Sequence, residues 1–195
     1  MPTLRTFIAI DLDRELKAEI ERVQECLRQQ VAPRSIRWVK PGAIHLTLKF
    51  LGDTPSDRVG AVKEAMVEAA LQVSPFTFRV SNLGCFPNTR RPRILWAGLE
   101  DPTGSLTSLR DAIEAQVVPL GFPTETRPFR PHLTLGRVQR HASKSEVIEA
   151  GAVVFNSPVG AIGEMAVTSV AFIKSDLRPG GAVYTTLAEA SLAGN

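Results

Sequence analysis

The chain has 195 residues, of which 44% are hydrophobic and 22% are charged, a composition that excludes intrinsic disorder and fits one compact domain. Its formal net charge of +3 excludes a uniformly basic surface, so an anionic partner would have to bind at a local cluster of Arg and Lys. We expect a single domain over residues 1–195 and a monomer.

The sequence has no feature of a secreted or membrane protein. The apolar run at the N-terminus meets Asp11 and Asp13 at once and lacks the cationic leader of a signal peptide. No stretch approaches the roughly 18 to 20 uninterrupted apolar residues that a membrane helix needs. Cys26 and Cys85 stand alone without CxxC spacing, which indicates reduced thiols. We therefore expect a cytoplasmic protein that contacts no membrane.

In chain order, the first half predicts a mixture of strands and helices. β-rich residues favour a strand over 6–12, and Asp13 is placed to cap a helix over 14–30, where apolar residues recur at helical spacing. The pair Pro41-Gly42 separates two short strands, over 35–39 and 44–51. Ser56 is placed to cap a second helix over 57–72, and a strand over 76–83 follows.

The second half continues the mixture. A loop over 84–88 leads to a strand over 93–99, and a third helix follows over 104–120. A strand over 132–138 and a short helix over 143–150 come next. Two strands over 166–175 and 182–187 close the chain around Pro179-Gly180-Gly181. No glycine-rich phosphate loop opens a helix after a strand, so we expect no nucleotide cofactor.

The tetrapeptide His-Leu-Thr-Leu occurs twice, at residues 45–48 and 132–135, although the chain has only three histidines. Alternate side chains of a strand share a face. Each copy therefore presents an imidazole and a hydroxyl on one face and two leucines on the other. The copies lie about half the chain apart, which predicts two pseudo-symmetric lobes that each contribute one tetrad.

The repeated tetrad points to acid and base chemistry on a phosphodiester. Two facing imidazoles provide a base and an acid near neutral pH, because an unperturbed histidine titrates near about 6.5. We expect His45 and His132 to be catalytic, with Thr47 and Thr134 donating hydrogen bonds to the phosphate oxygens. Catalytic zinc usually takes three His, Cys or carboxylate ligands, and His141 lies in a polar stretch after the strand. The sequence thus favours a metal-free site.

Two HxTx tetrads in the two halves resemble the 2H phosphoesterase superfamily, and within it the RNA 2′,3′-cyclic phosphodiesterases, historically called 2′-5′ RNA ligases. The similarity covers nearly the whole chain and rests on the segments RTFIAIDL, HLTLKFLG, FPNTRRPRILWAGL, GFPTETRPFRPHLTLGR and SDLRPGGAVYTTL. It implies a bilobed α+β fold in which two antiparallel sheets, flanked by helices, surround a central cleft.

The resemblance also implies a reaction. This is metal-independent hydrolysis of a terminal 2′,3′-cyclic phosphate on RNA to a 2′-phosphate. His45 would be the proton donor to the 3′ oxygen, and His132 the acceptor that activates water.

Two further positions are implied by the resemblance. Arg137 matches an arginine near the phosphate, although its odd offset from Thr134 places it on the leucine side unless the strand twists or bulges after Gly136. Phe7 matches an aromatic position that can stack on the terminal base, and a plain core residue on the first strand is the alternative.

Arginines cluster near the second tetrad and between two strands. Arg127 and Arg130 precede the second tetrad, and Arg90, Arg91 and Arg93 lie between the strands predicted over 76–83 and 93–99. They either line the approach for the RNA backbone or are simply solvated. We take Arg130 as a substrate-binding residue and leave the others open.

Two other functions stay open at this point. The same acid and base can ligate 2′,3′-cyclic and 5′-hydroxyl RNA ends into a 2′-5′ linkage. Alternatively, the chain is a non-catalytic module that binds nucleotides or RNA ends. Intact His and Thr in both tetrads favour the hydrolase, whose partner would be RNA with a cyclic phosphate end or a small cyclic nucleotide.

Overall fold

The computed structural model of the chain describes residues 2–157, 159–178 and 181–194. The turn predicted at Pro179-Gly180 lies outside the described residues. The helices are α1 (Arg14–Arg28), α2 (Val59–Ala70), α3 (Ser105–Val117) and α4 (Lys144–Asn156). The strands are β1 (Thr3–Asp11), β2 (Ile36–Trp38), β3 (His45–Pro55), β4 (Phe76–Phe86), β5 (Ile94–Glu100), β6 (His132–Val138), β7 (Ala161–Val167), β8 (Ser169–Arg178) and β9 (Gly181–Ser191).

Two antiparallel sheets form the framework, as the resemblance implied. The four-stranded sheet has the order β3-β1-β8-β9, and the five-stranded sheet has the order β2-β6-β5-β4-β7. In each sheet the strand with the tetrad pairs with a partner strand, β3 with β1 and β6 with β5, which spans the middle of the chain. That partner strand then pairs with a strand from the other half, β8 or β4. Both sheets therefore combine strands from both halves.

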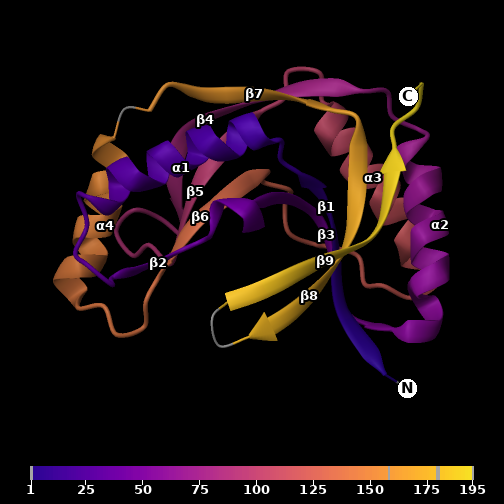
Figure 1. Cartoon of the computed structure of the whole chain (residues 1–195), viewed down its shortest axis with the longest axis horizontal. Coiled ribbons are helices and arrows are strands. Elements are labelled where there is room, and N and C mark those ends of the chain that lie inside the picture. The colour runs from indigo at the N-terminus through magenta and orange to yellow at the C-terminus, as the bar shows by residue number, and fades with distance from the viewer. Residues whose placement is uncertain (1, 158, 179–180, 195) are drawn as a thin grey trace.

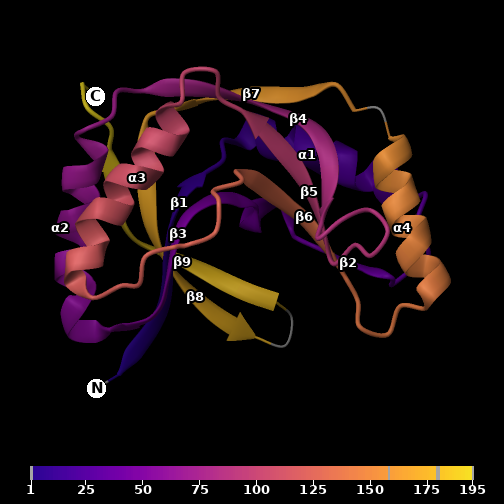
Figure 2. The ribbon, with the colours of Figure 1, turned by 180° about the vertical axis from the view of Figure 1, so that it is seen from behind.

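Helices flank the two sheets and leave the tetrad strands between them. Helices α2 and α3 pack together beside β8, β9 and β3, while α1 contacts β7 and α4 contacts β4. Figure 1 shows the two sheets meeting near the middle of the molecule, with the helices toward the outside. Figure 2 gives the same arrangement from behind, with β3 and β6 adjacent. This is the bilobed α+β arrangement expected.

One cluster of buried apolar side chains runs through both lobes. It includes Leu46 and Leu133 from the two tetrads together with Ile20 of α1 and Val62 of α2, all fully buried. Burial of this much apolar surface is the main favourable contribution to folding. Each tetrad is therefore anchored from behind by its own leucines.

One of the two helix caps proposed from the sequence is confirmed. The Asp13 carboxylate accepts a hydrogen bond from the backbone N–H of Leu16 at 2.7 Å. Ser143 begins α4 through a capping box with Glu146. The predicted cap at Ser56 is wrong, because Ser56 is the first residue of a 3-10 turn that precedes α2 and its hydroxyl donates to the Pro2 carbonyl at 3.0 Å.

Several boundaries differ from the sequence prediction. Strand β4 continues through Phe86, so the first part of the predicted loop over 84–88 is strand. Strand β7 was not predicted, because Gly163 and Glu164 interrupt its alternation of buried and exposed residues. Helix α4 continues past Gly151, which lies against the Thr89 backbone where a larger side chain would not fit.

None of the helices in the described ranges is long and apolar enough to cross a membrane.

Candidate active site

Both tetrads adopt the alternation predicted from the sequence. In each copy the leucines are buried and the histidine and threonine are partly exposed, over residues 45–48 of β3 and 132–135 of β6. Each histidine is the first residue of its strand. The imidazole and the hydroxyl of each copy therefore share one face of their sheet.

Each tetrad also contains a β-bulge at its last leucine. Two consecutive residues of β1 pair with Thr47 and Lys49 of β3, so that Leu48 is skipped. Two consecutive residues of β5 pair in the same way with Thr134 and Gly136 of β6, so that Leu135 is skipped. Leu48 and Leu135 are thus the extra residues. A bulge reverses the alternation beyond it, so the residue three positions after each threonine returns to the face of the histidine.

The bulge settles the orientation of Arg137. Its odd offset from Thr134 placed it on the leucine side of a regular strand, but the bulge at Leu135 brings it back to the side of His132 and Thr134. The bulge lies one residue earlier than the position considered from the sequence. Arg137 is exposed.

The residue equivalent to Arg137 in the first tetrad is Phe50, which the sequence analysis did not single out. Phe50 pairs with Phe7 of β1 across the bulge and is 64% exposed. Comparing the two tetrads beyond their fourth residue would have shown that Phe50 and Arg137 occupy the same position.

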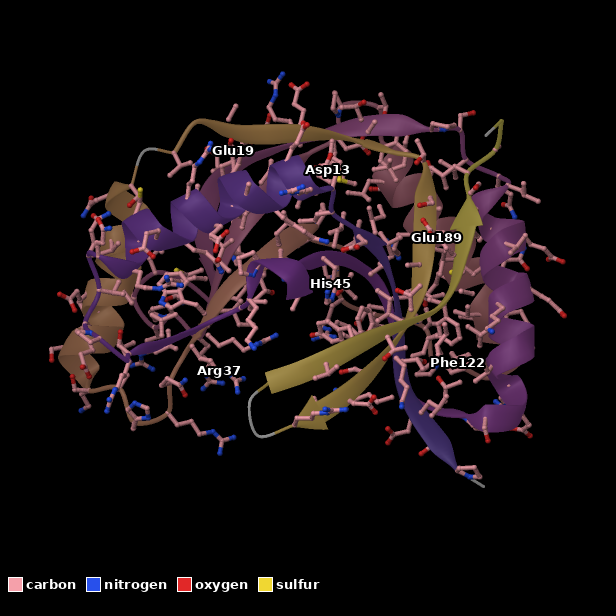
Figure 3. All side chains as sticks on the ribbon, viewed as in Figure 1. Asp13, Glu19, Arg37, His45, Phe122 and Glu189 are labelled. Carbon is pink, nitrogen blue, oxygen red and sulfur yellow. The ribbon has the colours of Figure 1, made fainter. Side chains whose placement is uncertain are left out.

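The tetrads come from different sheets and lie toward one another. Strands β3 and β6 are in contact. Arg137 of the five-stranded sheet acts by its charge on His132 and also on Tyr184 of the four-stranded sheet. The ring of Tyr184 meets that of His45 edge-on, with centroids 5.0 Å apart. Arg137 therefore lies close enough to both His132 and Tyr184 for its charge to act on each, and Figure 3 places His45 near the centre of the molecule.

The two imidazoles are held in the same tautomer. Nδ1–H of His45 donates to the Ala43 carbonyl at 3.0 Å, and Nδ1–H of His132 donates to the Arg130 carbonyl at 2.7 Å. A carbonyl oxygen only accepts, so Nδ1 carries the proton in both rings. Nε2 is therefore the atom of each ring that can exchange a proton with a substrate.

Aromatic rings fix the imidazole planes. Phe7 stacks on His45 with centroids 4.6 Å apart, and Phe86 meets His132 edge-on at 4.9 Å. Tyr184 and Phe86 were not among the expected site residues, because neither lies in a tetrad and only the fold brings them there.

Burial lowers the pKa of both histidines below the ordinary value, because an apolar environment disfavours the imidazolium form. The neighbouring charges then act in opposite directions on the pKa values of the two rings. Asp11, directly opposite His45 across β1 and β3, favours its protonated form, although Lys17 opposes this. Arg137 disfavours the protonated form of His132.

Phe7 has a different environment from the one that base stacking needs. Its ring is only 3% exposed and packs between His45, Phe50 and Tyr184. A ring enclosed in this way has no open face for a nucleobase, so the packing supports the core alternative for Phe7.

The arginines near the second tetrad differ in their surroundings. Arg130 is exposed and its carbonyl holds His132. Arg127 forms a two-pronged pair with Glu125, which holds the pKa of that carboxyl at about 2. Arg127 is therefore already engaged by a carboxylate. Arg90 and Arg91 lie in the loop between β4 and β5.

Neither cysteine belongs to the site. Cys26 and Cys85 are both free thiols, and burial raises the pKa of Cys85 to about 11. Among the residues that the structure describes, no group of three or more His, Cys, Asp and Glu side chains is placed to hold a metal ion.

The sequence matches a known family in two consecutive segments. The family model described as LigT like Phosphoesterase matches residues 10–96 and again residues 98–184. Each matched segment contains one tetrad.

Two curated relatives match over nearly their whole length. An RNA 2′,3′-cyclic phosphodiesterase of Methanothermobacter thermautotrophicus is 32% identical over 184 residues, which cover 94% of this chain and 96% of that protein. A protein of the same name from Archaeoglobus fulgidus is 31% identical over 184 residues, with coverages of 94% and 98%.

Solved structures have the same fold. A crystal structure of a Thermus thermophilus protein superposes with a TM-score of 0.82 at 30% identity and covers 98% of this chain and 99% of its own. The structure of Escherichia coli LigT complexed with 3′-AMP has a TM-score of 0.77 at 26% identity, with coverages of 97% and 98%. With the paired tetrads and the two-sheet fold, these matches show that the chain belongs to the LigT-like phosphoesterase family.

Proposed function

We propose that this protein hydrolyses the terminal 2′,3′-cyclic phosphate of RNA to a 2′-phosphate. The observation that carries the proposal is the pair of His and Thr side chains presented by β3 and β6, each imidazole with Nε2 free to exchange a proton. The names of the curated relatives agree with this activity.

In the proposed reaction each histidine moves one proton. His132 Nε2 accepts a proton from water as the water oxygen bonds to phosphorus. The bond between phosphorus and the 3′ oxygen breaks, and Nε2–H of His45 donates its proton to that oxygen. The product keeps the phosphate on the 2′ oxygen. The charges beside the rings support this order, because Asp11 favours a protonated His45 and Arg137 favours a neutral His132.

The remaining site residues bind the substrate in this proposal. The hydroxyls of Thr47 and Thr134 donate to the non-bridging oxygens, where negative charge increases in the transition state. The guanidinium of Arg137 adds a charged donor on the same face. We assign stacking on the terminal base to the exposed ring of Phe50 rather than to the enclosed ring of Phe7.

Product analysis tests the proposal. A labelled oligoribonucleotide ending in a 2′,3′-cyclic phosphate is incubated with the enzyme in excess EDTA, with a second oligonucleotide that has a 5′-hydroxyl. We expect conversion to the 2′-phosphate and little ligation, because water competes in great excess. A 2′-5′ linked main product would make ligation the function. Binding without turnover would indicate a non-catalytic module, and activity that requires added zinc or manganese would contradict the metal-free mechanism.

A further inference from the structure

Two arginines lie directly opposite each other at the edge of the five-stranded sheet. Arg37 of β2 pairs with Arg137 of β6 in the antiparallel register. Directly opposite residues share a face, with Cβ atoms about 4.5 to 5.5 Å apart, and like charges placed there are destabilising. An anion between the two guanidinium groups would remove that repulsion.

The shared face of these arginines is the face of the catalytic side chains. Their neighbours Trp38 and Ile36 pack on the opposite side, where both crowd the position of Gly136. Ile36 there belongs to a buried cluster that includes Leu95 of β5 and Val154 of α4. Arg37, like Arg137, therefore points away from that cluster and toward the side of His132 and Thr134.

Neither arginine is neutralised within the protein. Both are exposed, and neither forms an ion pair with any residue in the described ranges. Glu149 of α4 lies at this end of the sheet, where its carboxylate accepts from the backbone N–H of Ala32 at 3.3 Å. The segments over 34–40, 87–93 and 136–145 contain no Asp or Glu. They carry further cations beyond the pair, which include Arg34, Lys40, Arg90, Arg91, Arg93 and Arg140. Figure 3 shows Arg37 on this side of the molecule, away from the helices α2 and α3.

The four-stranded sheet has an alternative surface for the RNA, on which positive and negative side chains are mixed. An open groove of about 670 Å³ is lined there by Arg5, Lys174 and Arg178, but also by Asp53 and Asp176. Lys174 is already paired with Asp176 at 3.0 Å. A polyanion gains less from this groove than from the arginine-rich end of the five-stranded sheet.

We infer that Arg37, beside Arg137, binds the phosphodiester on the 5′ side of the terminal nucleotide. The inference rests on the proposed function and narrows its substrate. A cyclic mononucleotide has no phosphodiester at that position, so the protein prefers an RNA chain with a cyclic phosphate end. The RNA then continues from Arg37 over the cationic side chains at the end of β2, β5 and β6.

The preference for RNA over mononucleotide tests this site. We compare kcat/KM for 2′,3′-cyclic AMP with kcat/KM for a short oligoribonucleotide ending in a 2′,3′-cyclic phosphate, in the wild type and in Arg37→Gln. The preference for the oligonucleotide should fall by about tenfold or more, mainly through KM, because one charge-assisted contact is lost. The salt dependence of oligonucleotide binding should become shallower by about one phosphate contact.

Three controls make the result decisive. Arg22→Gln removes the same charge from the exposed side of α1, where Arg22 pairs with Glu19, and should leave the preference unchanged. Arg5→Gln probes the alternative groove, and a larger loss of preference there than in Arg37→Gln would overturn the inference. Arg37→Lys keeps the charge and should fall between Arg37→Gln and the wild type.

The outcome is separable from that of the proposed function. An unchanged preference in Arg37→Gln would refute the RNA site while turnover of the mononucleotide still supports the phosphodiesterase. An equal loss on both substrates would place Arg37 at the scissile phosphate and would also overturn the inference. Absence of turnover in the wild type on either substrate would instead contradict the proposed function.

Discussion

Asp11 and Arg137 place opposite charges beside two imidazoles that are otherwise held alike. Both rings are largely buried, which lowers the pKa of each, and both donate Nδ1–H to a carbonyl two residues earlier. Identical tetrads cannot assign an acid and a base by themselves. The resemblance implies the two roles, and the charges of two residues outside the tetrads support them, one on the neighbouring strand and one beyond the bulge.

These charges predict how the pH profile responds to substitution. The acidic limb of kcat/KM should lie below about pH 6.5, because burial lowers the pKa of the base. Removing the positive charge in Arg137→Gln relieves the repulsion of the imidazolium, raises the pKa of His132, and should move the acidic limb to higher pH. Asp11→Asn removes an attraction, lowers the pKa of His45, and should move the basic limb to lower pH.

The measurement is kcat/KM against pH at constant ionic strength, with Arg22→Gln as the variant that changes net charge at a distance. Because the two limbs report apparent pKa values of the coupled pair of histidines, the informative result is the direction in which each limb moves. Movement of the acidic limb to lower pH in Arg137→Gln would contradict the assigned electrostatics.

The two threonines should each contribute to the rate rather than to folding. Thr47→Val and Thr134→Val keep the shape of the side chain and remove one donor to the phosphate, which costs on the order of 10² to 10³ in kcat. Thr77→Val on the exposed face of β4 is the matched control and should keep full activity. If the tetrad variants lost thermal stability but kept normal activity per folded molecule, the hydroxyls would be structural.

At the scale of the elements, the bulge in β6 is held from behind by a buried amide. Gln24 of α1 is buried, and its Nε2 donates to the carbonyls of Leu135 and Val39 at 2.8 Å each. The backbone N–H of Val39 donates to the same Leu135 carbonyl at 2.9 Å. The helix thereby fixes the residue whose insertion turns Arg137 toward the site.

Gln24→Met should therefore affect both stability and catalysis. The substitution keeps the volume and removes both hydrogen bonds, which should lower the free energy of unfolding by about 1 to 3 kcal/mol. Looser positioning of Arg137 should also lower kcat/KM. Urea denaturation and steady-state kinetics measure the two effects. Gln30→Met is the control, because the exposed amide of Gln30 donates to the Cys26 carbonyl of its own helix turn, and the variant should stay within about 0.5 kcal/mol of the wild type. A Gln24 variant with unchanged stability and activity would show that the bulge holds without this amide.

The sequence predicted those elements whose signals are local. Asp13 caps its helix through a contact within one turn, and the alternation in each tetrad follows from the strand period. The bulges at Leu48 and Leu135 are different, because they exist only as a mismatch in length between paired strands. For this reason Phe50 was missed and Arg137 could not be oriented from its spacing.

At the scale of the whole molecule, the site depends on strands that are far apart in the sequence. Tyr184 reaches His45 because β9 pairs with β8, and β8 with β1, although β9 lies near the end of the chain. Phe86 reaches His132 through β4 and β5 in the other sheet. Neither contact has a local signal, so the tetrads could be found from the sequence and their aromatic supports could not.

The same architecture supplies the proposed reaction with one histidine from each sheet. A single sheet supplies one imidazole and one hydroxyl on its face, whereas the proposed reaction moves two protons, one at water and one at the departing oxygen. The two lobes are therefore expected to act on one phosphate as a unit, and loss of either histidine should remove most of the rate.

The most direct test of this division of labour uses a substrate in which sulfur replaces the bridging 3′ oxygen of the cyclic phosphate. A thiolate departs with little help from an acid. We predict that His45→Ala loses about 10² to 10⁴ in rate on the ordinary substrate and recovers much of it on the sulfur substrate, whereas His132→Ala stays slow on both because the base is missing. Recovery of His132→Ala instead would reverse the two roles. Near-normal activity of either variant on the ordinary substrate, with an unchanged fold by circular dichroism, would contradict the two-histidine mechanism itself.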